Sequence, residues 1–110
     1  MFGLKFGKKV CEMDEGAATA FWQWFVESEK WIVECLENSD AQFVYEVDKH
    51  LKPVFPYVRR ELEFQLGYED GKGELFLFHF GDDALERDGE RLKRLMPAEL
   101  ASRWEFILDI

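Results

Sequence analysis

The sequence predicts a single α+β domain whose elements follow the order α-α-β-β-α-β. Three observations predict it: apolar residues recur with a helical period over residues 16–51, the period changes to two after Pro56, and a third helical segment separates the last two alternating runs. The 110 residues are 47% hydrophobic and 16% aromatic, which is enough for a packed core and excludes a disordered chain. We therefore expect a mixed three-stranded sheet packed against helices.

Residues 1–14 precede the first helix, and the first ten of them are locally basic, with Lys5, Lys8 and Lys9. Apolar side chains at positions 2, 4 and 6 alternate with other residues, so residues 2–6 can form a short strand. That strand would be the fourth of the sheet and would bring the fold close to a ferredoxin-like arrangement. The alternative for residues 1–14 is a loose arm.

The first helix is predicted over residues 16–37. A stripe of polar residues runs along it at intervals of four and three: Gln23, Glu27, Lys30, Glu34 and Glu37. The apolar arc opposite covers more than half of the circumference, which is wider than a helix lying on one surface requires. Either this helix lies between the sheet and another helix, or its Trp24 and Trp31 side is exposed for a partner. Glu29 interrupts the arc and is expected at its edge or in an ion pair.

A second helix is predicted to begin at Ser39-Asp40-Ala41-Gln42, which has the S-x-x-Q form of a capping box. Its apolar face consists of Val44, Val47 and Leu51. The helix ends before Pro53 and Pro56, because proline cannot donate a backbone hydrogen bond. The connection between the two helices is about two residues long, so we expect a helical hairpin.

Three strands and a third helix follow. The alternation of Leu62, Phe64, Leu66 and Tyr68 with polar residues predicts a half-buried strand, and Asp70-Gly71 predicts a hairpin turn. The returning run 75–80 is apolar on both faces, which predicts a central strand with both faces covered, the second by a helix or a loop.

The third helix is predicted to begin at Asp82 or Asp83, which can cap it. Gly89 on its apolar side indicates close approach to the sheet. Pro97 ends this helix, and the alternating run 104–110 predicts the last strand.

Several short aromatic and turn motifs occur along the sequence. They are Trp22-Gln23-Trp24-Phe25, Glu63-Phe64-Gln65-Leu66 before the acidic glycine turn, Met96-Pro97, and Trp104-Glu105-Phe106. In these motifs the chain resembles a family of uncharacterised small bacterial proteins over about residues 20–110. It departs from that family at Phe80-Gly81-Asp82, where a Ser-Ala-Asp-Gly turn is expected. The resemblance implies the fold and a bacterial source, and it implies no activity.

The net charge of the chain limits the classes of partner that it is expected to bind. Asp and Glu outnumber Lys and Arg by 23 to 14, and the net charge of -9 disfavours binding to a phosphate backbone, so no nucleic acid is expected as a partner. The apolar runs are too short for a membrane span, so no membrane is expected either. Cys11 and Cys35 lack CxxC spacing and a histidine cluster, which is typical of reduced thiols in a cytoplasmic protein.

No set of residues forms a catalytic, cofactor or metal motif, so we predict none of these. His79 lies on one face of the central strand, either as a base in a pocket or as a half-buried side chain bonded to a carboxylate. Asp82, Asp83 and Asp88 can offer oxygen ligands to a hard cation, although solvated acids at a helix start are the ordinary explanation for them.

We therefore predict a non-catalytic protein-interaction or self-associating module. Its candidate contact residues are Trp22, Trp24 and Trp31, and its ligand is a protein partner or a second copy. One alternative is an acidic binder of the antitoxin or immunity type, which covers a basic surface. Another is a small ligand-binding domain or enzyme that uses His79 in a pocket between the helical hairpin and the sheet.

Overall fold

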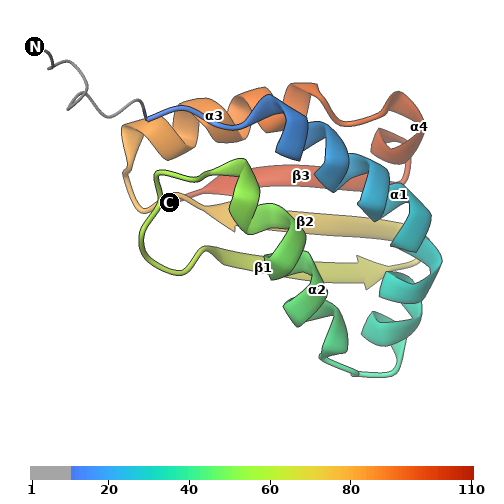
Figure 1. Ribbon diagram of the computed structural model, residues 1–110. Helices are drawn as coiled ribbons and strands as arrows, with labels where there is room; N and C mark the ends of the chain where they lie inside the picture. The colour runs from blue at the N-terminus through green and yellow to red at the C-terminus, as the bar shows by residue number, and fades with distance from the viewer. Residues whose placement is uncertain (1–10) are drawn as a thin grey trace, which may run out of the picture.

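The computed structural model describes residues 11–110 and confirms the α+β class and the order of the elements (Figure 1). The first half of the fold consists of α1 (Glu15–Glu37), α2 (Gln42–Leu51) and the short 3-10 turn η2 (Lys52–Val54). The second half consists of β1 (Glu63–Glu69), β2 (Lys72–Phe78), α3 (Asp83–Arg94), the one-turn helix α4 (Ala98–Ala101) and β3 (Trp104–Asp109). The predicted strand over residues 2–6 lies outside the described residues.

The three strands lie in the order β1-β2-β3, with β1 and β2 antiparallel and β2 and β3 parallel. β2 is therefore the central strand, as predicted. Glu69 and Lys72 are paired across the hairpin, and Asp70 and Gly71 between them have φ values of 52° and 76°. These left-handed conformations are the ones that a two-residue hairpin turn requires, so the prediction from Asp-Gly is confirmed.

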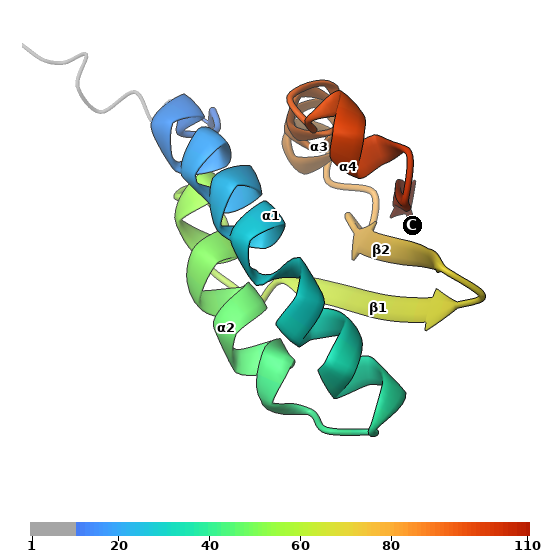
Figure 2. The same cartoon turned by 90° about the vertical axis from the view of Figure 1, so that its right-hand side faces the viewer.

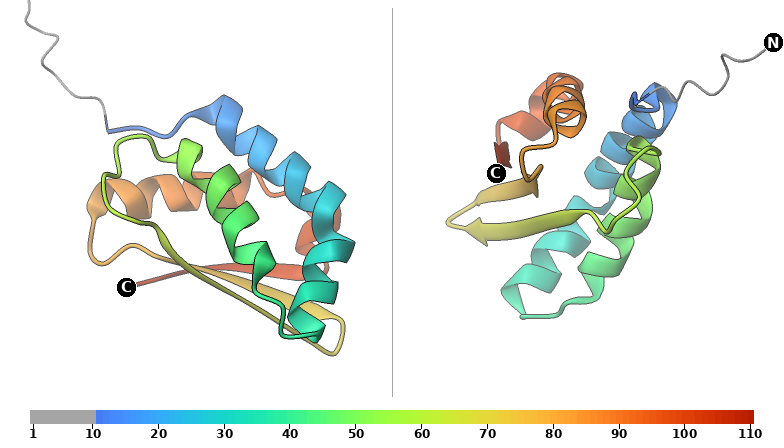
Figure 3. Two further views of the ribbon diagram at one scale, coloured as in Figure 1. Left: turned by 60° about the horizontal axis from the view of Figure 1, so that its bottom comes forward. Right: turned by 90° about the vertical axis from the view of Figure 1, so that its left-hand side faces the viewer.

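Among residues 11–110 the helices cover one face of the sheet, so the second face of β2 is not covered by a helix, one of the two covers predicted for it (Figures 2 and 3). Leu75 and Leu77 point toward the helices and are buried. Phe76 and Phe78 point the other way and are half-buried, with their rings stacked at 6.1 Å between centroids. The run is apolar on both sides because the two rings shield each other where no helix covers them.

The apolar arc of α1 is wide because this helix contacts neighbouring elements on several sides. Trp22 is buried against α3 and the sheet: its Nε1 donates to the backbone oxygen of Leu92 at 2.9 Å, and its ring meets that of Phe106 edge-on. On the other flank, Trp24 stacks on His50 of α2 at 4.3 Å between centroids. α1 is 23 residues long, yet no helix within residues 11–110 is both long and apolar enough to cross a membrane.

The predicted capping box at Ser39–Gln42 is wrong. Ser39 has a left-handed φ of 55°, and the N–H groups of Ser39 and Asp40 donate to the backbone oxygens of Leu36 at 3.4 Å and Cys35 at 2.8 Å. These bonds close the end of α1, so Ser39 terminates one helix and does not begin the next. α2 begins at Gln42 instead, and the Gln42 N–H donates to Oδ1 of Asp40 at 3.0 Å.

α3 begins and packs as the sequence predicts. Asp82 is its N-cap, and its Oδ1 accepts from the N–H groups of Ala84 and Leu85 at 3.0 and 3.1 Å. Gly89 lies against Leu108 of β3, where an added Cβ would come within 2.5 Å of Cδ2. The close approach that Gly89 indicated is therefore confirmed.

Gly73 is the tightest glycine of the sheet. It is buried beside Trp104 on the neighbouring strand, and an added Cβ would lie 2.4 Å from the indole ring. A buried ring cannot move aside as the end of a flexible side chain can. Gly67 of β1 offers a matched contrast, because nothing lies within 4 Å of its Cβ position.

We expect Gly73→Ala to lower the free energy of unfolding by about 2 kcal/mol, because the added methyl group displaces Trp104. Gly67→Ala should leave the free energy of unfolding close to that of the wild type. Urea unfolding followed by tryptophan fluorescence measures both. Equal denaturation midpoints for the two variants would contradict the packing described for Gly73.

Candidate functional site

An open groove between α1 and α2 is lined by the exposed flank of α1. Its volume is about 570 Å³, and its walls are formed by Trp24, Ser28, Trp31, Gln42, Tyr45 and Glu46. Two of the three tryptophans that the sequence marks as contact residues, Trp24 and Trp31, therefore line one groove. They are seven residues apart, a spacing that places side chains on the same side of a helix.

Trp24, which lines this groove, stacks on His50 of α2. The ring planes of Trp24 and His50 are 8° apart, and His50 Nδ1 donates to the backbone oxygen of Glu46 at 2.9 Å. Trp31 lies at the rim with 36% of its surface exposed. The groove thus combines a stacked aromatic side chain with an aromatic side chain that a partner can reach.

A second groove, of about 640 Å³, runs along the other side of α2 toward β1. Val44, Leu62 and Phe64 form its apolar part, and Tyr45 borders both grooves. Tyr45 is 74% exposed. The two grooves and Tyr45 between them are named the Tyr45 surface below.

Sequence reasoning missed Tyr45 and misplaced Val44. The helical spacing of Val44, Val47 and Leu51 suggested one buried face, yet only Val47 and Leu51 are buried and Val44 is 43% exposed. The available signal was the adjacent pair Val44-Tyr45, because the core-facing stripe of a short surface helix does not need two large neighbouring apolar residues.

Trp22 lies in the core and is removed from the surface of the folded chain. It is 2% exposed, and its indole N–H is already bonded to Leu92. Of the three predicted contact residues, Trp24 and Trp31 are the two that a partner can touch.

His79 is buried where β2 meets α3, with 5% of its surface exposed. Its Nδ1 accepts from the N–H of Gly81 at 3.1 Å, in place of the expected carboxylate partner. Its backbone bonds to Asp109 and Asp82, each at 2.9 Å. A base in a ligand pocket needs an open approach, whereas this ring closes a turn.

Asp88 is fully buried in α3, which corrects its interpretation as a solvated acid. Tyr57 Oη donates to its Oδ2 at 2.7 Å, while Arg87 Nε and Arg91 Nη1 donate to its Oδ1 at 3.0 and 3.1 Å. Burial acts to raise the pKa of Asp88, but the hydrogen bonds from Arg87 and Tyr57 outweigh it and hold the pKa below its ordinary value. The carboxylate thus fastens the segment after η2 to α3.

The pKa of the Tyr57 phenol shifts in the opposite direction to that of Asp88. Burial raises its pKa, and the hydrogen bond to Asp88 raises it further, because that bond holds the proton on the phenol.

No group of three or more His, Cys, Asp or Glu side chains in residues 11–110 is arranged to hold a metal ion. Asp88 pairs with Arg87 and Arg91 within α3 and connects this helix to Tyr57.

Glu29 forms an ion pair, as expected. Arg103 Nε and Nη2 donate to its two carboxylate oxygens at 2.8 Å each, and Trp104 Nε1 donates to Oε2 at 3.0 Å. The hydrogen bond from Arg103 is the largest influence on Glu29 and lowers its pKa below the usual value. This cluster connects the middle of α1 to the start of β3.

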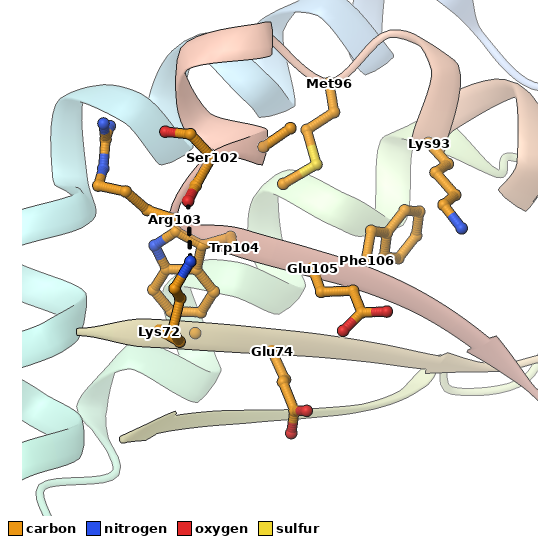
Figure 4. A pocket seen from close by; sticks show the side chains of 11 residues that line it. Lys72, Glu74, Lys93, Met96, Ser102, Arg103, Trp104, Glu105 and Phe106 are labelled. Atoms are coloured by element: carbon orange, nitrogen blue, oxygen red, sulfur yellow. Dashed lines mark hydrogen bonds between the residues drawn. The ribbon is translucent and has the colours of Figure 1, made fainter. Parts of the chain in front are cut away.

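A further groove, of about 550 Å³, lies between the α3–α4 connection and the starts of β2 and β3 (Figure 4). Lys72 crosses part of it and donates to the backbone oxygen of Ser102 at 3.4 Å. Lys72, Lys93 and Arg103 stand in the same lining as Glu74 and Glu105, so basic and acidic side chains are mixed there. Such a lining favours neither an anion nor a cation.

Comparison of the chain with models of known families, with curated proteins and with solved structures found no match. The resemblance to a family of small bacterial proteins therefore stays a prediction from the aromatic motifs. What supports a function is the geometry of the chain itself.

The Glu29 cluster predicts a stability contribution that depends on pH. Because the pKa of Glu29 is lowered on folding, its ion pair stabilises the fold at pH values above the usual pKa of 4.5 and loses this effect as the pH falls through the lower folded-state pKa. We expect Glu29→Gln to lower the free energy of unfolding at pH 7 by about 1 kcal/mol, since Arg103 is partly exposed to water.

The difference between wild type and Glu29→Gln should shrink at pH values below about 4.5. Urea unfolding at pH 7 and at pH 3 measures it. Glu27→Gln is the control, because Glu27 is an exposed acid of the same helix. A difference that stays constant across this range would show that the ion pair with Arg103 contributes nothing.

Proposed function

We propose that the chain is a protein-interaction module that contacts another protein, or a second copy of itself, through the Tyr45 surface. The observation that supports this is the position of Tyr45, which stands 74% exposed between a groove lined by Trp24 and Trp31 and a second, more apolar groove. Tyrosine and tryptophan are enriched at protein interfaces because they bury a large apolar area and keep a polar tip for hydrogen bonding.

The exposure of these side chains is not needed by the fold. The core is formed by buried residues of α1, the sheet and α3, and its aromatic members already contact one another. Val44, Tyr45 and Trp31 lie outside this core, and an exposed group of large apolar side chains is typical of an interaction site.

The charges around these grooves support a second candidate, an acidic binder of the antitoxin or immunity type. Glu46 lines the first groove, and Asp48, Glu61 and Glu63 line the second. An apolar surface with an acidic border complements a basic partner, both in binding and in the rate of encounter.

Replacing the exposed aromatic side chains tests the proposal. We expect Tyr45→Ala and Trp31→Ala each to weaken the association by about tenfold or more, because truncated aromatic anchors cost about 1–2 kcal/mol at an interface. Light scattering over a range of protein concentrations measures self-association. Affinity capture from extracts of the source cells, with cross-links mapped by mass spectrometry, measures binding of another protein.

Leu95→Ala is the matched control, because Leu95 is also an exposed apolar residue and belongs to the end of α3. The proposal requires a complex that wild type and Leu95→Ala form equally, that Tyr45→Ala loses, and whose cross-links lie on α2. A wild-type monomer whose captured proteins are unchanged by Tyr45→Ala and Trp31→Ala would overturn it.

A further inference from the structure

The helices lie on one side of the sheet (Figure 2), and the other face carries an apolar strip. Phe76 and Phe78 of β2 and Ile107 of β3 point to this outer face and are half-buried. Phe80 continues the strip past the end of β2: its ring lies 6.5 Å from that of Phe78, and it is exposed. Among residues 11–110, no helix lies over this face of the sheet (Figure 3).

Carboxylates border the strip on both sides. Glu74 and Glu105 are direct neighbours in the parallel pairing of β2 and β3, and Glu63 and Asp109 flank Phe78 in the same way. Like charges at paired positions destabilise a sheet. Within the described part of the chain, none of these four acids belongs to an ion pair.

The apolar strip and its acidic border together determine which kind of ligand fits the outer face of the sheet. A second copy that docked through the same face would bring the acidic border against itself, because a two-fold interface joins identical patches. The complementary ligand is instead a segment that carries apolar side chains together with lysine or arginine.

One segment of the chain has this chemistry. Residues 1–10 contain Phe2, Leu4 and Phe6 together with three lysines and no acid. They precede Cys11, whose backbone oxygen accepts a hydrogen bond from Arg87 of α3.

The distance from this attachment point to the outer face is short. Asp83, where α3 begins, is about 6 Å from Arg87 along the helix axis, and the exposed Phe80 comes just before it. Ten residues span up to about 33 Å. The start of α1, the start of α3 and the end of β3 also lie at the same end of the molecule (Figure 1).

We propose that residues 1–10 bind the outer face of the sheet in the same molecule. The three apolar side chains cover the strip formed by Phe76, Phe78 and Ile107, and the lysines neutralise the carboxylates at its border. The protein thus carries its own ligand for this face, on the side of the sheet opposite the helices. This proposal does not depend on the Tyr45 surface.

Nuclear magnetic resonance on the full chain tests this proposal. We expect nuclear Overhauser effects between the Ile107 methyl groups and the side chains of Leu4 and Phe6. Reversing the three lysines (Lys5→Glu, Lys8→Glu, Lys9→Glu) should abolish these effects and shift the Ile107 and Phe76 resonances, because the added acids are repelled by the border.

A charge swap keeps the test independent of folding. Glu74→Lys with Glu105→Lys should also abolish the effects, and combining it with the three lysine reversals should restore them. The control is Lys30→Glu, Lys49→Glu and Arg94→Glu, which changes the net charge equally at exposed helix positions away from the strip and should leave the Ile107 resonances unchanged.

Three results would overturn the proposal. The first is an Ile107 resonance that is the same in wild type and in the triple lysine reversal. The second is contact between residues 1–10 and the Tyr45 surface in place of the sheet. The third is a dimer by light scattering that dissociates when the lysines are reversed, because the segment would then bind a second copy.

Discussion

Trp22 is buried where α1, α3 and β3 meet, and it joins the first helix to both of the others. Its indole N–H is bonded to the backbone oxygen of Leu92, and its ring packs edge-on against Phe106. Because α1 must bury this flank and also contact α2 on the other, the helices gather on one side of the sheet (Figure 2). The far face of the sheet and the outward side of α2 are what this arrangement leaves open.

The buried charges of the chain reinforce the same arrangement. Glu29 connects α1 to Arg103 and Trp104 at the start of β3, and Asp88 connects α3 to Tyr57 in the segment after α2. Both carboxylates are satisfied by hydrogen bonds within the fold. The acids outside these clusters include Asp48, Glu61 and Glu63, which give the groove between α2 and β1 a border of a single sign.

Much of the fold could be predicted from the conformational preferences of individual residues. The predictions failed where two elements competed for the same residue or where a distant residue covered a side chain. Asp70-Gly71 specified its turn because few other residues adopt two successive left-handed conformations. Ser39 failed as a predicted cap because the same residue was needed to close α1. Asp88 was misjudged because an acid in the middle of a charged helix looks solvated until Tyr57, 31 residues away, is placed against it.

The sequence by itself determined the three longer helices, the three strands and the hairpin turn, and that α1 has more apolar surface than one packing face requires. These features follow from periodicity and backbone conformation, which depend on near neighbours. Only the tertiary structure decided that Trp22 is buried while Trp24 and Trp31 line a groove, that Tyr45 stands between two grooves, and that Phe76 and Phe78 face away from every helix described. Those outcomes depend on which surfaces distant segments cover, and no local pattern records that.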